Sequence, residues 1–300
     1  MDYGTLFVQQ LLNGLHIGSI YALIALGYTM VYGIVKLINF AHGDVMMVGA
    51  YVAFFLITVC QLPFIIAVIL SMIFCAIMGV TIEKIAYKPL RQAPRMWALI
   101  TAIGVSFFLE TLFTILFGAN AMPFPTFALK PIEVGDLQIS KIMLISLSLS
   151  LVLMLALDLF IKHTKIGKAM RASSEDAKAA QLMGISVNRT ISIAFAIGSA
   201  LAAVGGVLFA VAYPQIKPLM GVMPGLKAFI AAVLGGIGIL PGAMLGGFAL
   251  GMIESLTKGF FSAFWPSASL WADAILFLIL IIVLLVKPSG ILGKNVREKV

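Results

Sequence analysis

Long apolar stretches separated by short polar connections dominate this 300-residue chain. The stretches run approximately over residues 8–31, 44–60, 64–82, 97–118, 142–161, 190–213, 225–257 and 267–286. About 20 apolar residues span a bilayer as a helix, and most of these stretches match that length. Only 11% of the residues are charged, which is too few to cover the surface of a soluble domain of this size. We therefore predict an all-α, polytopic transmembrane helical bundle of about eight spans, formed by a single transmembrane domain over residues 1–300.

The seventh stretch, 225–257, is too long for one crossing of a bilayer. It is interrupted by residues that break or end helices, namely Gly235, Gly236, Gly238, Pro241 and Gly242. We predict that this seventh segment is broken into two short helices or forms a re-entrant pair, and the sequence leaves open which of the two occurs.

The positive charges indicate an orientation. Fifteen of the 20 Lys and Arg residues fall on one side of the predicted bundle: Lys36, Lys84, Lys88, Arg91, Arg95, Lys162, Lys165, Lys168, Arg171, Lys178, Arg189, Lys287, Lys294, Arg297 and Lys299. The other side carries Lys130, Lys141, Lys217, Lys227 and Lys258. Because cytoplasmic loops are enriched in Lys and Arg, we predict that the N-terminus lies outside and the C-terminus in the cytoplasm.

Several kinds of chemistry lack their sequence patterns here. The chain has no G-x-x-x-x-G-K-[ST] phosphate loop and no G-x-S-x-G turn. His16, His42 and His163 are far apart, with no carboxylate or cysteine at metal-ligand spacing. We predict that the chain is not an enzyme and that it has no catalytic residues, metal or cofactor. Its net charge of +8 indicates membrane topology rather than nucleic-acid binding.

The longest predicted inner loop, 162–189, contains a compact helical pattern. Ser173 or Ser174 would cap its first turn, and the acids Glu175 and Asp176 would lie at the positive end of the helix dipole. Gly184 suits the left-handed conformation just past a helix end. The loop is therefore predicted to contain a short, well-delimited helix over residues 173–184.

Small and apolar residues of this helix, Ala179, Ala180 and Met183, share one face by i+3 and i+4 spacing. Such a face could enter a groove on a soluble partner. The alternative is a surface helix that rests on the inner leaflet or on neighbouring loops. The physical pattern alone leaves both interpretations open.

Four sequence features together identify a family. They are Leu37–Asp44 (Leu-Ile-Asn-Phe-Ala-His-Gly-Asp), Gly235–Ala243 (Gly-Gly-Ile-Gly-Ile-Leu-Pro-Gly-Ala), Leu11–Leu15 with Gly18–Leu23, and the run Glu175, Ala179, Ala180, Gly184. The last resembles the EAA-type coupling loop of ABC importer permeases, although Asp176–Lys178 here separates the glutamate from the alanine pair. Over nearly its whole length the chain resembles the branched-chain amino-acid ABC transporter permease family of the LivH type.

This resemblance implies a function and a set of partners. The chain would be the membrane permease subunit of a binding-protein-dependent importer for leucine, isoleucine and valine in the bacterial plasma (inner) membrane. Its partners would be two ATP-binding cassette ATPase subunits, a second homologous permease subunit and a periplasmic or extracellular amino-acid-binding protein. The cytoplasmic coupling loop, 162–189, would contact the ATPase through Glu175, Ala179, Ala180, Met183 and Gly184.

Broken helices often mark the substrate pathway of a transporter, because freed backbone groups can meet a polar solute away from lipid. Two stretches fit this description, Asn39–Asp44 and Gly235–Gly242. The predicted pathway residues are Asn39, His42, Asp44, Gly235 and Gly236. For His42 and Asp44 the alternative is an interfacial loop with a helix cap.

Close helix packing is the alternative for the glycines, because Gly242 and Gly246 form one G-x-x-x-G pair and Gly247 and Gly251 form another. In the first span, Gln9, Asn13 and His16 share a helical face that could line an outer vestibule. Glu110 and Glu254 fall deeper in predicted spans, so each is expected to turn toward protein or water and to find a partner there.

Two other functions compete with the leading one. Within the same class, the chain could be a permease for urea, amides or other amino acids. In a different class, it could be a stand-alone secondary carrier or channel, an interpretation motivated by Asp44, Glu110, Glu254 and the broken seventh segment.

Overall fold

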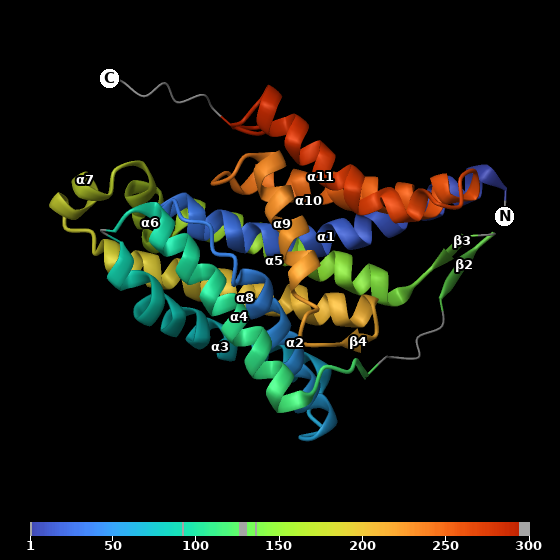
Figure 1. The fold of residues 1–300 in the computed structure, drawn as a ribbon, viewed down its shortest axis with the longest axis horizontal. Helices are drawn as coiled ribbons and strands as arrows, with labels where there is room; N and C mark the ends of the chain where they lie inside the picture. The colour runs from blue at the N-terminus through green and yellow to red at the C-terminus, as the bar shows by residue number, and fades with distance from the viewer. Residues whose placement is uncertain (1, 92, 126–130, 136, 294–300) are drawn as a thin grey trace.

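The computed structural model describes residues 2–91, 93–125, 131–135 and 137–293. Of the basic residues used to predict the orientation, Lys130, Lys294, Arg297 and Lys299 lie outside the described residues. The described chain is almost entirely helical (Figure 1), which confirms the all-α class.

Eleven α-helices are present in the described ranges: α1 (Tyr3–Val35), α2 (His42–Thr58), α3 (Phe64–Ile82), α4 (Arg95–Phe117), α5 (Lys141–His163), α6 (Lys165–Glu175), α7 (Ala177–Leu182), α8 (Val187–Ala212), α9 (Val222–Gly235), α10 (Leu240–Ser255) and α11 (Ala268–Val286). A π-helical turn at Glu83–Tyr87 and a 3-10 turn at Lys88–Leu90 extend α3, and equivalent turns at Leu256–Phe260 and Phe261–Ala263 extend α10.

Seven of these helical segments are long and apolar enough to cross a membrane, whereas α2 and α9 are apolar but shorter. Two small antiparallel ribbons complete the fold. One pairs β1 (Met122–Pro123) with β4 (Gln215–Ile216), and the other pairs β2 (Ile132–Val134) with β3 (Leu137–Ile139).

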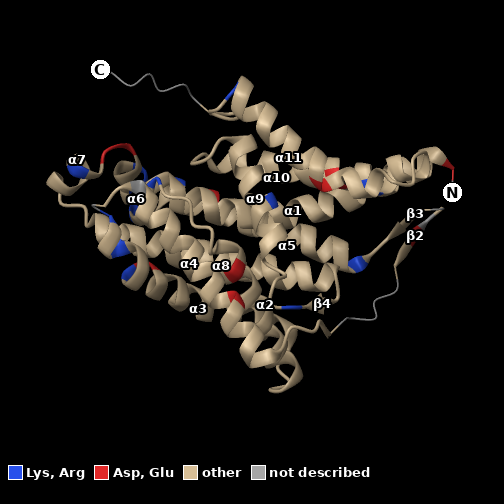
Figure 2. Ribbon diagram, in the orientation of Figure 1, with Lys and Arg blue, Asp and Glu red and all other residues tan. Residues whose placement is uncertain are grey.

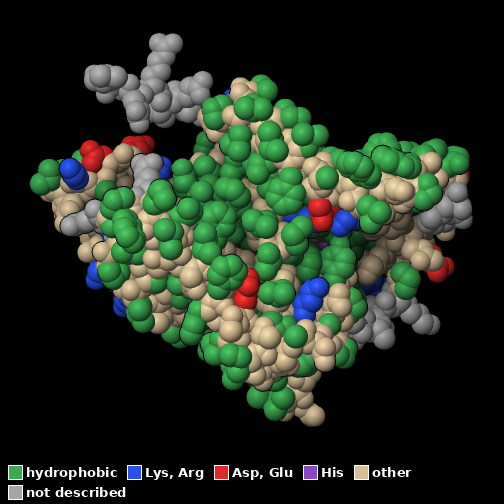
Figure 3. All heavy atoms as spheres, in the orientation of Figure 1, with side chains coloured by type: hydrophobic (Ala, Val, Ile, Leu, Met, Phe, Trp, Pro, Cys, Tyr) green, Lys and Arg blue, Asp and Glu red, His purple; other side chains and the backbone are tan. Residues whose placement is uncertain are grey.

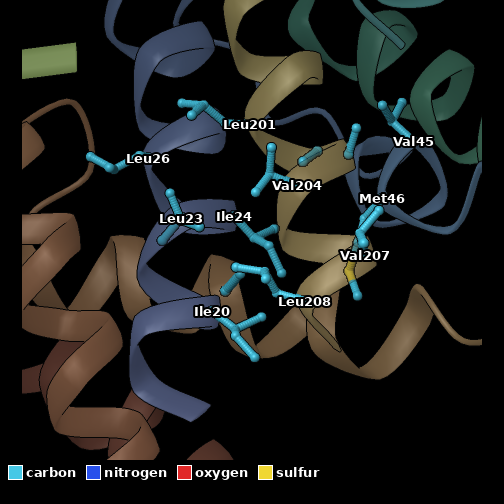
Figure 4. Close-up of a cluster of buried hydrophobic side chains, with 14 of the residues drawn as sticks. Ile20, Leu23, Ile24, Leu26, Val45, Met46, Leu201, Val204, Val207 and Leu208 are labelled. Atoms are coloured by element: carbon cyan, nitrogen blue, oxygen red, sulfur yellow. The ribbon is translucent and has the colours of Figure 1, made fainter. Parts of the chain in front are cut away.

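The core of the bundle is formed by α1 and α8, whose apolar membrane-length stretches are the most buried of the candidate spans. Figure 4 shows Ile20, Leu23 and Ile24 of α1 beside side chains of α8 such as Val204 and Leu208, with Met46 of α2 close by. By contrast, only a minority of the residues of α3, α4, α5 and α11 are buried, and each of these helices exposes several large apolar side chains. Figure 3 shows these hydrophobic side chains spread widely over the face in view, as expected of a surface that meets lipid.

Small residues allow the central helices to approach closely. On α10, Gly242 and Gly246 face Gly235 and Ala231 of α9, and Gly247 and Gly251 face Ala22 and Gly18 of α1. Each of these α10 glycines is so near its neighbour's backbone that a Cβ atom would overlap it. The two G-x-x-x-G pairs therefore serve helix packing, one against α9 and the other against α1.

The 225–257 stretch is broken into two helices, α9 and α10, which pack against each other as a hairpin. The turn between them, Gly236–Ile239, contains two glycines in the positive-φ region, Gly236 at 110° and Gly238 at 93°. The first helix of the pair begins at Val222, three residues earlier than the apolar stretch predicts.

Two helices, α2 and α9, begin inside the protein rather than at its edge. After α1 ends, Lys36 adopts a left-handed conformation and the chain folds back, so that His42 at the start of α2 lies against Gly27 of α1. The start of α9 lies against the start of α2, with Gly221 and Gly225 touching Gly43. Both short apolar helices therefore start at one place within the bundle.

The two ends of the molecule differ in charge. The N-terminus and the β2–β3 ribbon lie at one end, and α6, α7 and the last described residues lie toward the other (Figure 1). Figure 2 shows several Lys and Arg residues gathered around α6 and α7, with few at the opposite end.

Candidate functional site

A pocket lies where α2 and α9 begin, bordered on its third side by α4. Its volume is about 160 Å³. Its lining comes from α1, α2, α4, α9 and the residues that precede α2 and α9: Tyr28, Phe40, Gly43, Asp44, Ile103, Ser106, Phe107, Glu110, Gly221, Val222, Gly225 and Leu226. We call this the helix-start pocket.

Glycine makes the pocket possible. A Cβ atom on Gly43 would overlap the carbonyl oxygen of Gly221 and crowd the Cα atom of Gly225, so only glycine lets the two helix starts meet. The side chain of Tyr28 closes one wall, with its ring centroid 4.5 Å from that of His42. Neither helix start has a capping side-chain hydrogen bond, and backbone carbonyl oxygens, such as that of Ala41 for α2 and that of Leu219 for α9, accept from N–H groups there.

Two carboxyl groups meet in this pocket. Asp44 is only 2% exposed and accepts a hydrogen bond from the hydroxyl of Ser106, at the middle of α4. Its other oxygen, Oδ1, has no donor among the described residues. The carboxyl group of Glu110, one helical turn from Ser106, is close enough to interact with that of Asp44. None of the residues that line the pocket is Lys or Arg.

The predicted pathway residues occupy two separate places. His42 and Asp44 begin α2, and Asn39 is buried just before them, where its Oδ1 accepts a 2.6 Å hydrogen bond from the hydroxyl of Tyr87. The Nε2 atom of His42 is buried without a hydrogen-bond partner among the described residues. Gly235 and Gly236 lie instead at the α9–α10 turn.

The surroundings of that turn show how it is held. The backbone N–H groups of Ile291 and Leu292 donate to the carbonyl oxygens of Leu234 and Gly235, at 2.8 and 3.1 Å. The segment that follows α11 is thereby tied to the end of α9. The structure does not bring Gly235 and Gly236 to the helix-start pocket.

Sequence reasoning missed the segment that meets the Asn39–Asp44 break in the structure. That segment is Gly221–Gly225, where glycines flank Val222, Met223 and Pro224. The signal was present, because Gly and Pro at the beginning of an apolar stretch mark a helix start. It was overlooked because the glycines at 235–242 are more numerous.

A second charged group lies between α1, α9, α10 and α11. Lys227 Nζ is 2.7 Å from Oε1 of Glu254 and 2.8 Å from Oδ1 of Asp273. Glu254 also accepts hydrogen bonds from Lys258 and from the hydroxyl of Tyr21, the latter at 2.8 Å. We call these five residues the lysine cluster. Its two cations and two anions balance.

A polar pocket of about 380 Å³ lies beside the lysine cluster, toward the end of the molecule that carries the N-terminus. Asn13 and His16 line it, as their shared helical face predicts, together with Gln10 and Ser255. Gln9 is not among the lining residues and hydrogen-bonds the backbone of Gln138, in the middle of β3. Tyr213 also lines the pocket; its burial, with a contribution from the charge of Glu254, raises the pKa of the phenol above its usual value.

No group of three or more His, Cys, Asp or Glu side chains that could hold a metal ion occurs among the residues that the structure describes.

The predicted helix at 173–184 is divided in two. Ser173 and Ser174 belong to the last turn of α6, so the prediction that one of them caps the following helix is wrong. Asp176 is the cap instead, because its carboxylate accepts hydrogen bonds from the N–H groups of Lys178 and Ala179 at 2.8 and 3.0 Å. An extended backbone at Asp176, with φ at −145°, ends α6 and starts α7. Gly184 has a φ of 83°, as expected of a residue just past a helix.

The predicted coupling face of α7 is only partly accessible. Ala180 is buried against the protein, whereas Ala179 and Glu175 are exposed. The largest exposed apolar side chains are Leu182, at 89%, and Met183, at 82%. Sequence reasoning missed Leu182, because the spacing rule grouped Met183 with the two alanines.

A hydrogen-bonded network connects this region with the helix-start pocket. Buried Glu83, beyond α3, pairs with Arg91 and accepts a 2.7 Å hydrogen bond from the hydroxyl of Ser192 on α8. Arg91 also donates to the side chain of Asn188, in the first turn of α8. The same π-helical turn that begins at Glu83 ends at Tyr87, which holds Asn39. The chain that leaves α7 is thus linked to the segment in front of α2.

Comparisons with known proteins agree with one another. A family model described as the permease component of the branched-chain amino acid transport system matches residues 10–284. The chain is 43% identical to the high-affinity branched-chain amino acid transport system permease protein LivH of Salmonella typhimurium, over 98% of each chain. It is 42% identical to the corresponding protein BraD of Pseudomonas aeruginosa, again over 98% of each.

A solved structure shares the fold. It is PsaBC from Streptococcus pneumoniae in complex with Fab, with a TM-score of 0.50 and 16% identity over 92% of this chain and 91% of that one.

Proposed function

The chain belongs to the family of branched-chain amino acid transport permeases, and we propose that it carries leucine, isoleucine and valine across the membrane by way of the helix-start pocket. It is a multi-pass membrane protein and the permease component of its transport system, without a catalytic role of its own. The observation that carries the proposal is a polar pocket with two carboxyl groups, set among membrane-spanning helices of a chain that matches these permeases over nearly its full length.

The orientation follows from the distribution of charge. Basic residues gather at the end that carries α6 and α7 (Figure 2), and cytoplasmic surfaces are enriched in Lys and Arg. We place that end in the cytoplasm of a bacterium and the N-terminus on the outer side of its inner membrane. Counted with α2 and with both helices of the α9–α10 hairpin, nine helical segments traverse the bundle, an odd number that agrees with termini on opposite sides.

The partners follow from the family and from the sequence. With no phosphate loop, the chain depends on other subunits for ATP hydrolysis. We propose a complex of this chain with a second homologous permease subunit, two ATP-binding cassette ATPases and an amino-acid-binding protein on the outer side.

The ATPase contact is proposed at α7. Leu182 and Met183 present apolar side chains to solvent at the end assigned to the cytoplasm, which suits insertion into a groove of a soluble subunit. Glu175 and Ala179 would flank this contact, buried Ala180 would anchor α7 to the permease, and Gly184 would set the turn that follows.

We also propose how a movement of α7 is transmitted to the substrate pathway. The network from Asn188 and Ser192 through Glu83 and Arg91 to Tyr87 would transmit a shift of the coupling loop, 162–189, to Asn39. Asn39, His42 and Asp44 would then change the width of the helix-start pocket as the transporter alternates between outward and inward openings. Gly235 and Gly236 would serve at the inner end of the path, where α9 ends.

Reconstitution tests this function. The chain is purified with its two ATPases and second permease subunit, inserted in liposomes, and supplied with the binding protein and leucine. We expect leucine uptake that requires ATP. Uptake of urea or an amide but not of leucine would overturn the substrate assignment. Flux by this chain alone, driven by a proton or sodium gradient, would show a secondary carrier instead.

A further inference from the structure

The helix-start pocket opens on the outer surface of this chain rather than into a closed core. Among its lining residues, Ile103 and Phe107 of α4 are exposed and Glu110 is half-buried. Figure 3 shows an acidic side chain among hydrophobic ones near the middle of the visible face, in the region where Figure 2 draws α2 and α4. Because an ionisable group at membrane depth avoids lipid, this opening must face a water-filled path or a neighbouring subunit.

The charges in this pocket are not balanced. Asp44 and Glu110 bring two carboxyl groups together, and no Lys or Arg lines the pocket with them. Ser106 supplies one hydrogen bond to Asp44, and Oδ1 of Asp44 is left without a donor among the described residues. A buried carboxylate is costly without a cation or donors beside it. The pocket is therefore built to receive a cationic group.

The helix starts add little to this chemistry. In α9 the N–H of Val222 donates to the carbonyl oxygen of Leu219, that of Gly225 donates to Gly221, and Pro224 has no N–H group. The start of α9 therefore presents no set of free backbone donors to the pocket, and the polar chemistry of the pocket is that of its two carboxyl groups.

The remaining wall is apolar. Phe40, Ile103, Phe107 and Leu226 surround the polar groups and suit an aliphatic side chain. The pocket thus offers, within about 160 Å³, an anionic side and an apolar side.

We propose that Asp44 and Glu110 together bind the α-ammonium group of the transported amino acid. This assignment rests on the proposed function, since it takes an amino acid as the substrate. It gives the two neighbouring carboxyl groups the cation that the lining of the pocket does not supply.

The test measures weak binding directly, so that the selectivity of the binding protein does not intervene. The complete permease–ATPase complex is placed in nanodiscs without binding protein, and saturation-transfer difference NMR follows three ligands. Leucine carries both charged groups, 3-methylbutylamine lacks the carboxylate, and 4-methylpentanoate lacks the ammonium group. The wild-type complex should bind leucine and 3-methylbutylamine more tightly than 4-methylpentanoate.

The informative variants are Glu110→Gln and the double variant Asp44→Asn/Glu110→Gln. Each charged hydrogen bond is worth about 10-fold or more in affinity. We expect Glu110→Gln to weaken leucine and 3-methylbutylamine about 10-fold and the double variant to weaken them further. Binding of 4-methylpentanoate should not decrease. Glu110→Asp keeps the charge and should bind leucine within a few-fold of wild type.

The matched control is Asp158→Asn, which neutralises a carboxylate on α5 whose partner is Lys162, 2.7 Å away on an exposed surface. It should leave all three ligands unaffected. If the double variant fails to assemble, the single Glu110→Gln variant decides the question, because the side chain of Glu110 is half-buried rather than packed in the core.

Unchanged leucine binding in Glu110→Gln would overturn the proposal. The proposal would also be overturned if leucine binding to the wild-type complex were lost on removal of sodium ions or on a change of pH, and not on removal of the ammonium group from the ligand. The proposed function fails separately, if the wild-type complex takes up no leucine when the binding protein and ATP are present.

Discussion

Two groups of charged side chains lie among the membrane-spanning helices, and they differ in balance. The lysine cluster contains two cations, Lys227 and Lys258, against two anions, Glu254 and Asp273. The helix-start pocket contains Asp44 and Glu110 with no cation among its lining residues. Both groups sit where charge is expensive.

This difference indicates which charged group serves the fold and which serves transport. In the lysine cluster each charge already has a partner within this chain, so the cluster can hold α9, α10 and α11 together without a ligand. In the helix-start pocket the balancing positive charge must come from a ligand that binds there. Substitutions in the first group should therefore affect folding, and substitutions in the second should affect transport.

Replacing Lys227 by Met should have the largest effect on stability. It leaves buried Glu254 and its neighbour Asp273 short of a cation, and breaking a buried ion pair on one side costs about 3–5 kcal/mol. Thermal unfolding of the purified protein in detergent measures this loss. The double variant Lys227→Met/Glu254→Met restores the balance of charge and should recover part of the lost stability. A single variant as stable as wild type would show that the cluster does not hold the fold.

Gly43→Ala should have the second-largest effect on stability. A Cβ atom there overlaps backbone of Gly221, which cannot move without shifting the start of α9. Overpacking of this kind costs about 1–3 kcal/mol, and leucine uptake should be lost as the pocket distorts. Gly104→Ala is the control, because on α4 the added Cβ meets nothing within 4 Å. Equal uptake in the two variants would contradict the close approach of the helix starts.

Leu182→Asp should weaken attachment of the ATPase and spare the fold. The side chain is almost fully exposed in the permease alone, so its loss removes contacts only from the complex. We expect at least a 10-fold fall in ATPase affinity, measured by co-purification and by ATP-dependent uptake, with thermal stability unchanged. Lys178→Gln, on the same helix, should behave as wild type. If Leu182→Asp retains full affinity, α7 rests on the membrane or on neighbouring loops instead.

Tyr87→Phe should have the smallest effect. It removes the buried hydroxyl that donates to Asn39, a hydrogen bond worth about 1 kcal/mol. Uptake should fall a few-fold because the segment before α2 is held less firmly. The ratio of ATP hydrolysed to leucine carried reports whether coupling is affected, and an unchanged ratio with unchanged uptake would remove Tyr87 from the proposed route.

Much of the fold could be predicted from apolar length. The positions of α1, α3, α4, α5, α8 and α11 follow from stretches that match a bilayer, and the break between α9 and α10 follows from its glycines. The inward starts of α2 and α9 could not be predicted, because an apolar stretch does not show at which depth its helix begins. That depth depends on the contacts of Gly43 with Gly221 and Gly225.

The site could be predicted only in part. Asp44 stood out as a charge next to an apolar stretch, and Glu110 and Glu254 stood out as deep acids. Which acid has a partner depends on packing between helices that are distant in sequence, as for Lys227 with Glu254. The cap of α7 illustrates a local limit, because Ser173, Ser174 and Asp176 are all good caps and the end of α6 decides among them.

The most direct test places the two charged groups side by side. Thermal unfolding and ATP-dependent leucine uptake are measured for Glu110→Gln and Lys227→Met in the same reconstituted transporter. We predict that Glu110→Gln unfolds at the wild-type temperature but carries leucine about 10-fold more slowly, whereas Lys227→Met unfolds at a clearly lower temperature. Normal uptake by Glu110→Gln together with a lowered unfolding temperature would contradict the account, because the unbalanced pair would then serve the fold.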